Sequence, residues 1–421
     1  MTTLIVSVFL AFFLLRFAVE TGLLLVNLRH VRAAGEAVPE PLRGHFGVED
    51  ARKSLAYTLA NGRFTLIHGT YGAALALAVL FSGFLPGLSD FLAGRGLSGA
   101  HLFVVYLVAL MAVLSVLNLP FGLYHTFVIE ARFGFNRTTW KLWLTDRLKG
   151  LAIGAVLGVP LLYAVYGFMA FAGSAWWVWL FAFLTAYQVV MTWLYPAVIA
   201  PLFNKFQPLP EGELKQRLEK LGEDARFRNR GLFVVDASRR SGHSNAYFTG
   251  LIRPRIVLFD TLVQQMSVDE AAAVLAHEIG HYKARHIYKG LAMGLASMAV
   301  SLWVLSVLVA WPPMFQAFGF RAPSFHAALA LFSLCAGAFT FFFDPLAAWF
   351  SRRHEYEADR FSVQLARAPE ALESALVRLN RDNLSNLNPH PWYSRWHYSH
   401  PTLLERIAAI ERAEDASPYR A

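Results

Sequence analysis

The sequence predicts a mainly α-helical, polytopic membrane protein with about seven transmembrane helices and a small β-sheet outside the membrane. Of its 421 residues, 56% are hydrophobic and only 16% are charged, whereas soluble domains carry about 25% charged residues. The mean hydropathy is +0.41. Each of seven apolar stretches is long enough to cross a hydrocarbon core of about 30 Å. They are Leu4–Leu28, Phe64–Phe84, His101–Tyr124, Gly150–Ala172, Ala175–Phe203, Gly290–Trp311 and His326–Phe350.

The loop charges predict the orientation of these stretches. The first stretch is too long for a removable signal peptide and lacks a small-residue cleavage site, so we expect a retained helix. Basic residues gather after the first, third, fifth and seventh stretches. Because Lys and Arg favour cytoplasmic loops, the amino terminus is predicted outside and the carboxyl terminus in the cytoplasm. The same bias accounts for the net charge of +9. No basic-aromatic module is found in the sequence, so no nucleic-acid partner is expected.

Several polar side chains fall inside the apolar stretches. Arg16 and Glu20 are four residues apart on one helix face, which predicts an ion pair directed into the helix bundle, with a role in substrate handling as the alternative. Further polar residues, His68, Asn118 and Asp344, indicate a partly polar interior.

The segment between the fifth and sixth stretches is predicted to fold outside the membrane. A short amphipathic helix is expected from Gly212. Gly231–Ser238, Ser244–Gly250 and Arg255–Asp260 have the composition of three short strands. An extended peptide can add to a sheet edge through main-chain hydrogen bonds. Ser244–Gly250 is the candidate edge, so Ser244, Asn245, Ala246 and Tyr247 are candidate substrate contacts, with an ordinary packing strand as the alternative.

The stretch Ser267–Tyr282 carries the chemistry. Ser267 and Glu270 have the spacing of a capping box, and strong helix formers follow. His277 and His281, four residues apart, lie on one helix face and can share a tetrahedral zinc ion. Zinc lowers the pKa of a bound water to about 7, and Glu278 is placed to take its proton. By chance alone the pattern arises in roughly one chain in twenty of this length. The helix is expected to continue unbroken into the sixth stretch.

A third metal ligand is expected further along the chain. The longer H-E-x-x-H-x-x-G-x-x-H pattern fails, because its last two positions hold Ala284 and Ile287. The seventh stretch is followed by Ser351–Ala366, in which Glu355 and Asp359 share one helix face. One carboxylate can bind the metal while the other orients a ligand histidine. A solvated charged helix is the alternative reading of this segment.

The remaining polar residues are interpreted from their positions in the sequence. Cys335 is the only cysteine, which excludes an intrachain disulfide and a cysteine zinc site. His286 is expected at the surface or at the lipid headgroups, and Glu357 is expected to point away from the metal. In the tail, His400 and Arg406 are candidate donors to the oxyanion of a tetrahedral intermediate or to a ligand carboxylate.

Six segments together resemble the type-1 CaaX prenyl endopeptidase family of membrane-integral gluzincin zinc peptidases. They are FGFNRTTWKLW, PLFNKFQPLPEGEL, RSGHSNAYFTG, HEIGH, SRRHEYEAD and SHPTLLER. The resemblance implies a helical barrel around a water-filled intramembrane chamber, closed at its cytoplasmic end by the zinc domain. It also implies one Zn²⁺ per chain and a role for each site residue. These are His277, His281 and Glu355 on zinc, Glu278 as general base, Asp359 beside a ligand, and Asn245, His400 and Arg406 on the substrate or transition state.

The expected activity is zinc-dependent endoproteolysis. Eukaryotic members of this family remove the last three residues after a prenylated cysteine, so the expected partners are the lipid bilayer and a prenylated or membrane-associated polypeptide. Compact loops predict a bacterial member in the inner membrane, with its site facing the cytoplasm. The alternatives are a quality-control protease without prenyl dependence, and a non-catalytic scaffold or transporter. The intact motif residues and the unbroken, non-repeated stretches disfavour the last two.

The chain is expected to divide into four segments. Residues 1–203 hold the first five membrane helices, and residues 204–289 hold the sheet and the first metal helix. Residues 290–350 hold the last two membrane helices. Residues 351–421 hold the third ligand and a tail that completes the site.

Overall fold

The computed structural model describes residues 1–227, 230–250 and 254–415, so the end of the predicted tail segment, 416–421, lies outside the described residues. Among the described residues, seven helices are long and apolar enough to cross a membrane, and each overlaps one of the seven predicted stretches. The first six contain α1 (Thr2–Ala34), α2 (Val48–Phe81), α4 (Gly99–Tyr124), α5 (Trp140–Phe171), α6 (Trp176–Leu194) and α11 (His286–Val309). The seventh is formed by α13 (Phe325–Cys335), α14 (Gly337–Thr340) and α15 (Asp344–Ala366) in succession.

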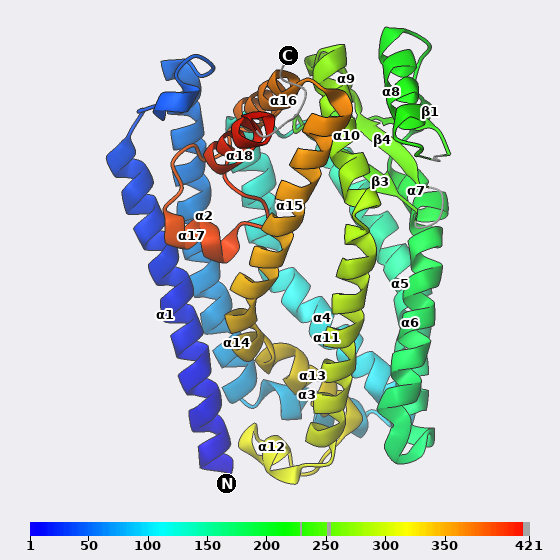
Figure 1. The fold of residues 1–421 in the computed structure, drawn as a ribbon. Helices are drawn as coiled ribbons and strands as arrows, with labels where there is room; N and C mark the ends of the chain where they lie inside the picture. Colours follow the sequence, from blue (N-terminus) through cyan, green and yellow to red (C-terminus); the bar gives the residue numbers. More distant parts are fainter. Residues whose placement is uncertain (228–229, 251–253, 416–421) are drawn as a thin grey trace.

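The membrane helices are arranged in a ring (Figure 1). Helix α1 packs against α2 and α14, and the contacts continue from α4 to α5, α6, α11 and α13. Helices α2 and α4 are joined inside the apolar region by a 3.1 Å hydrogen bond between His68 Nε2 and Asn118 Oδ1. The predicted ion pair of Arg16 and Glu20 is confirmed, with Nε and Oε2 3.3 Å apart. These four polar side chains of the membrane helices are thus paired with one another.

An apolar core fills the end of the ring that carries the amino terminus, where Figure 1 shows short helices across the ring. The short helices α3 (Phe84–Gly94) and α12 (Pro312–Ala317) lie there. Phe9, Leu85, Phe103, Tyr106 and Phe315 are each at most 3% exposed. Where these side chains belong to membrane helices, their packing stabilises this end mainly through van der Waals contacts. The opposite end carries the sheet and the carboxyl-terminal helices.

The small sheet has four strands in the order β1-β2-β4-β3. Strands β2 (Leu232–Val235) and β4 (Arg255–Phe259) are parallel, while β3 (Ala246–Thr249) pairs with β4 antiparallel and forms one edge. The three predicted strands and the predicted edge are therefore confirmed. The first strand, β1 (Phe206–Pro208), was not predicted, because three residues ending in proline carry no strand pattern.

Short helices complete this end of the molecule. The helix predicted from Gly212 is confirmed as α8 (Glu213–Asp224), with Gly212 as its N-cap residue. Among the described residues, the remaining helices of this end are α7 (Ala200–Phe203), α8 (Glu213–Asp224), α9 (Asp260–Gln265), α10 (Val268–Lys283), α16 (Pro369–Asp382), α17 (Pro391–His397) and α18 (Leu403–Asp415).

The expectation of one continuous helix through His286 is wrong. Helix α10 ends at Lys283, and Arg285 adopts a left-handed conformation with φ of 57°. Helix α11 then begins at His286. A left-handed residue interrupts the run of helical hydrogen bonds, so the side chains of α11 do not continue the helical period of α10. The side chain of His286 is aimed differently from what an unbroken helix would give.

The predicted capping box at the start of α10 is confirmed and extends into a larger network. Ser267 N donates to Glu270 Oε2 over 2.8 Å, and Ser374 Oγ and Arg378 Nε donate to Glu270 Oε1 over 2.6 and 3.2 Å. Glu270 is 4% exposed. It thus ties α10 to α16.

We expect Glu270→Ala to lower the free energy of unfolding by about 2–4 kcal/mol, because three donors lose their acceptor and the helix loses its cap. Thermal unfolding of the protein in detergent measures this. Asp269→Ala, at the exposed neighbouring position, is the control and should change the midpoint little. Equal shifts for the two variants would contradict the assignment of Glu270 as the anchor.

Candidate active site

Two helices in very close contact carry the candidate metal ligands. Helix α10 packs along α15, and a Cβ atom placed on Gly280 would lie only 3.0 Å from Ala358 Cα and 3.1 Å from Ala358 O. Glycine at this position of the HEIGH motif therefore permits the approach. As a result, His277 and His281 on α10 face Glu355 on α15.

His277, His281 and Glu355 form a compact cluster in which one potential ligand atom from each lies within 4.8 Å of the others. The two Nε2 atoms are 3.1 Å apart. Glu355 Oε2 is 3.5 Å from His277 Nε2, and Glu355 Oε1 is 3.2 Å from His281 Nε2. Two imidazoles and one carboxylate are a common ligand set of catalytic zinc, with a fourth position left for water or substrate.

Glu355 fits a metal site for a second reason. The residue is 4% exposed, and its Oε2 atom accepts no hydrogen bond from the described residues. A buried carboxylate oxygen without a partner is costly in a folded protein. A cation between Glu355 Oε2 and the two Nε2 atoms would satisfy it. The residues present therefore fit the metal that the sequence motif predicts.

On the side away from the metal cluster, His277 contacts a buried ion pair formed by Asp359 and Arg406. Its Nδ1 lies 2.8 Å from Asp359 Oδ1, and Arg406 donates to both oxygens of Asp359 over 2.6 and 2.9 Å. Burial opposes a charge on His277, but its hydrogen bond to Asp359 and the nearby carboxylate of Glu355 outweigh burial and raise its pKa to about 9. Asp359 therefore orients His277, and Arg406, placed in the sequence as a transition-state donor, also fixes Asp359.

His281 has a different partner, which the sequence analysis missed. Its Nδ1 lies 2.9 Å from Nδ1 of His286, and His286 Nε2 lies 3.0 Å from Glu357 Oε2. His286 is only 7% exposed. The expected surface position of His286 is therefore wrong, because it assumed an unbroken helix. Glu357 points away from the metal cluster as expected, but it contacts the partner of a candidate ligand.

Glu278 is half-buried beside the two histidines. Its carboxylate accepts no hydrogen bond among the interactions of the described residues. Burial raises the pKa of Glu278 above its usual value, although the neighbouring His277 and His281 oppose this. A carboxylate in such a place is free to accept a proton from a water molecule.

The remaining candidates are two residues in the tail and four at the edge strand of the sheet. His400 Nε2 lies 3.5 Å from Glu355 Oε1, and Arg406 Nη1 lies 3.7 Å from Glu355 Oε2, so both side chains border the cluster. Asn245 is exposed just before the edge strand β3, whereas Ser244 and Ala246 are 7% and 8% exposed and Tyr247 is half-buried. The side chains of Ser244 and Ala246 pack inward, and the backbone N–H and carbonyl of Ser244 are both bonded to the side chain of Asn383.

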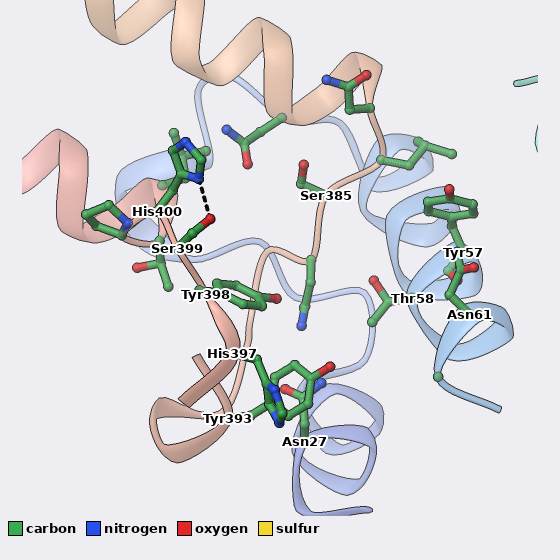
Figure 2. Close-up of a pocket in the computed structure, with 18 of the residues that line it drawn as sticks. Asn27, Tyr57, Thr58, Asn61, Ser385, Tyr393, His397, Tyr398, Ser399 and His400 are labelled. Carbon is green, nitrogen blue, oxygen red and sulfur yellow. Dashed lines mark hydrogen bonds between the residues drawn. The ribbon is translucent and has the colours of Figure 1, made fainter. Parts of the chain in front are cut away.

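A cavity of about 720 Å³ adjoins the cluster and includes His243, His400 and Arg406 in its lining. Figure 2 shows Tyr57, Thr58 and Asn61 of α2 facing the segment from Tyr393 to His400 across this space. Ser399 Oγ and His400 Nδ1 are hydrogen-bonded over 2.9 Å. Most polar groups in the lining are amides, hydroxyls and imidazoles, which suit the main chain of a peptide.

We expect Gly280→Ala to lower metal affinity and peptidase activity by at least about tenfold, because the new methyl group pushes α10 away from α15 and separates the histidines from Glu355. Metal content after dialysis and the rate of peptide cleavage measure this. Gly290→Ala, where a Cβ meets nothing within 4 Å, is the matched control. Unchanged metal content in Gly280→Ala would contradict the close-packing requirement.

Comparison with known proteins shows similarity over nearly the whole chain. Residues 27–205 match the family profile described as CAAX prenyl protease N-terminal, five membrane helices, and residues 208–414 match peptidase family M48. A CAAX prenyl protease 1 homolog of Oryza sativa subsp. japonica is 37% identical over 416 residues, covering 96% of this chain and 97% of the relative. CAAX prenyl protease 1 of Saccharomyces cerevisiae is 34% identical, covering 89% of this chain and 88% of the relative.

The crystal structure of S. mikatae Ste24p has the same fold, with a TM-score of 0.89 and 32% identity over 95% of this chain and 97% of that chain. The predicted fold class, a mainly α-helical barrel of seven membrane helices around a membrane chamber with a small sheet, is therefore confirmed. The readings as a non-catalytic scaffold or a transporter are not favoured. The chain thus belongs to peptidase family M48, as an integral membrane metalloendopeptidase.

Proposed function

We propose that this protein uses one zinc ion, held by His277, His281 and Glu355, to hydrolyse a peptide bond near the carboxyl terminus of a prenylated polypeptide at the membrane. The observation that carries the proposal is the buried Glu355 Oε2, which lacks a hydrogen bond and lies 3.5 Å from His277 Nε2. Zinc at such a site lowers the pKa of water to about 7 and polarises a carbonyl oxygen.

The remaining chemistry is assigned to residues of this chain. Glu278 takes a proton from the attacking water and passes it to the leaving amine. Asp359, fixed by Arg406, keeps the Nδ1 proton of His277 in place so that Nε2 is free to bind. His400 and Arg406, which border Glu355, donate hydrogen bonds to the developing oxyanion.

The surroundings of the cluster favour an extended peptide end as the substrate. The edge strand β3 can pair with an extended peptide, and Asn245 is exposed at its start. The cavity beside His400 has room for a few residues at the end of a peptide chain. The relatives are named for CAAX prenyl proteolysis. A prenylated chain end delivered from the membrane suits a site at the end of membrane helices.

The test is cleavage of a farnesylated CaaX peptide by the purified protein in detergent, beside the same peptide without the farnesyl group. Wild type and Glu278→Ala are compared, and zinc is quantified in each. Cleavage of only the farnesylated peptide by a zinc-bound wild type supports the proposal. Equal cleavage of both peptides indicates a protease without prenyl dependence. A protein that binds zinc but cleaves neither peptide overturns the substrate class, and one that binds no zinc overturns the metal site.

We expect the acid side of the pH profile of kcat/KM to lie above the usual carboxyl range of about 4–4.5. The pKa of Glu278 is raised chiefly by burial, so this base stays protonated to a higher pH and activity falls as the pH decreases through the raised value. Zinc content and unfolding temperature are measured at each pH to separate metal loss and unfolding. An acid limb at or below the ordinary glutamate value, with zinc retained, would contradict Glu278 as a base with a raised pKa.

We also propose that the protein lies in a bacterial inner membrane with its amino terminus outside and its site in the cytoplasm. Basic loop residues support this orientation. The loop after α4 and the sheet meet through a bridge between Asn136 and Ser241, on the side of the metal cluster. Labelling of single cysteines introduced at Ser174 and Glu219, with Cys335 replaced, distinguishes the two sides. Impermeant reagent on whole cells should reach position 174 alone.

A further inference from the structure

The two candidate histidine ligands are oriented by different kinds of partner. Their Nε2 atoms face each other at 3.1 Å, so both Nδ1 atoms point away from the metal position. His277 Nδ1 meets the carboxylate of Asp359, whereas His281 Nδ1 meets Nδ1 of His286 at 2.9 Å. We propose that His286 is a positioning residue that fixes His281 as a metal ligand and is itself held by Glu357. This inference rests on the proposed function.

Only one placement of protons satisfies every contact in this chain of side chains. A neutral imidazole carries one N–H, and the other nitrogen is an acceptor or ligand. If His281 binds through Nε2, its proton is on Nδ1, and Nδ1 of His286 must accept it. The proton of His286 is then on Nε2, 3.0 Å from Glu357 Oε2, which is an acceptor. The anion of Glu357 thereby selects the tautomer of His286, and His286 selects the tautomer of His281.

The surroundings hold His286 in this role. It is 7% exposed, and the ring of His354 stacks on it with centroids 4.0 Å apart and an interplanar angle of 15°. Glu357 is also paired with Arg353 and Lys289, at 3.5 and 3.7 Å. A buried imidazole whose two nitrogens both meet polar partners has little freedom to turn.

The backbone break between α10 and α11 creates the contact. In an unbroken α-helix, residues five positions apart lie about 140° apart around the axis, so His286 would face away from His281. The left-handed Arg285, with φ of 57°, turns the start of α11 and brings the imidazole of His286 back onto His281. A strained non-glycine residue thus supports an interaction at the metal site.

Two variants of His286 separate positioning from packing. In His286→Asn, the side-chain oxygen can take the place of Nδ1 and accept from His281, although it does not reach Glu357. In His286→Phe, a ring still fills the space and stacks on His354, but no acceptor remains. A packing role predicts that Phe is tolerated better than Asn, whereas the positioning role predicts the reverse order.

The experiment measures zinc affinity and zinc release to a chelator from the full-length protein in detergent, with unfolding temperatures of the zinc-free proteins. We expect His286→Phe to weaken zinc binding by about 10–100-fold, the usual cost of losing the partner of a ligand histidine. His286→Asn should stay within about threefold to fivefold of wild type. Glu357→Gln should weaken binding more than Arg353→Gln, a control that removes an ion pair of Glu357 without contacting His286.

The outcomes are distinguishable. Wild-type zinc affinity in a folded His286→Phe variant, or weaker binding by Asn than by Phe, overturns the positioning role while leaving the proposed function intact. Absence of zinc from the wild type overturns the proposed function itself. If His286→Phe does not fold, the comparison of Glu357→Gln with Arg353→Gln decides, and equal zinc affinities there overturn the inference.

Discussion

Glu278→Gln is expected to reduce peptide hydrolysis by about 10²–10⁴-fold, the contribution of a positioned general base, while the purified variant keeps its zinc. The amide has the shape of the carboxylate but cannot take a proton from water. The metal cluster does not include Glu278, since it consists of His277, His281 and Glu355. Loss of activity at full zinc content is therefore the signature of this residue.

The measurement is kcat/KM on a cleavable peptide, with zinc determined on the same sample. Glu219→Gln, on the exposed side of α8, is the control and should retain wild-type activity. Activity of Glu278→Gln within a few-fold of wild type would exclude Glu278 as the base. Loss of zinc together with activity would instead place Glu278 among the ligands.

Glu355→Gln is expected to abolish activity by a different route, through loss of the metal. The substitution replaces an anionic oxygen ligand by a neutral amide at a site where both histidines lie within 3.5 Å of the carboxylate. The loss of zinc affinity should exceed the roughly 10–100-fold loss caused by removing a residue that only hydrogen-bonds a metal ligand. The variant should therefore purify with little zinc and regain activity only at high zinc concentration.

Chelator competition measures this affinity, and restoration of cleavage by added zinc separates metal loss from misfolding. Glu370→Gln, an exposed carboxylate at the start of α16, is the control. Wild-type zinc affinity in Glu355→Gln would show that the third ligand lies elsewhere. Asp359, which hydrogen-bonds His277, would then be the next carboxylate to test.

Features that depend on local periodicity were predictable from the sequence. Seven apolar stretches predict seven spans because hydrocarbon thickness fixes the length of a spanning helix. The spacing of His277 and His281 puts them on one face, and the spacing of Glu355 and Asp359 does the same on a second helix. Each pair needed only the helical period. Their assembly into one cluster follows once α10 and α15 meet at Gly280.

Features that depend on single backbone conformations or on distant contacts were not predictable. Arg285 has no sequence feature that indicates a left-handed residue, so the helix break and the partnership of His286 with His281 were missed. The one available signal was the third histidine, five residues beyond the second. The hold of Arg406 on Asp359, 47 positions away, depends on how α18 meets α15.

The continuity of α15 has a consequence for how the bilayer acts on the enzyme. This helix runs without interruption from Asp344, inside the seventh apolar stretch, to Ala366, beyond the metal cluster. Glu355 lies about 16 Å along it from Asp344. A helix responds to a thinner or thicker bilayer by tilting, and a tilt of about 5° about Asp344 displaces Glu355 by about 1.4 Å. The histidines are on α10, which packs directly against α15 at Gly280 and is bonded to it through His277 and Asp359, so the two ligand helices are expected to follow such a tilt together.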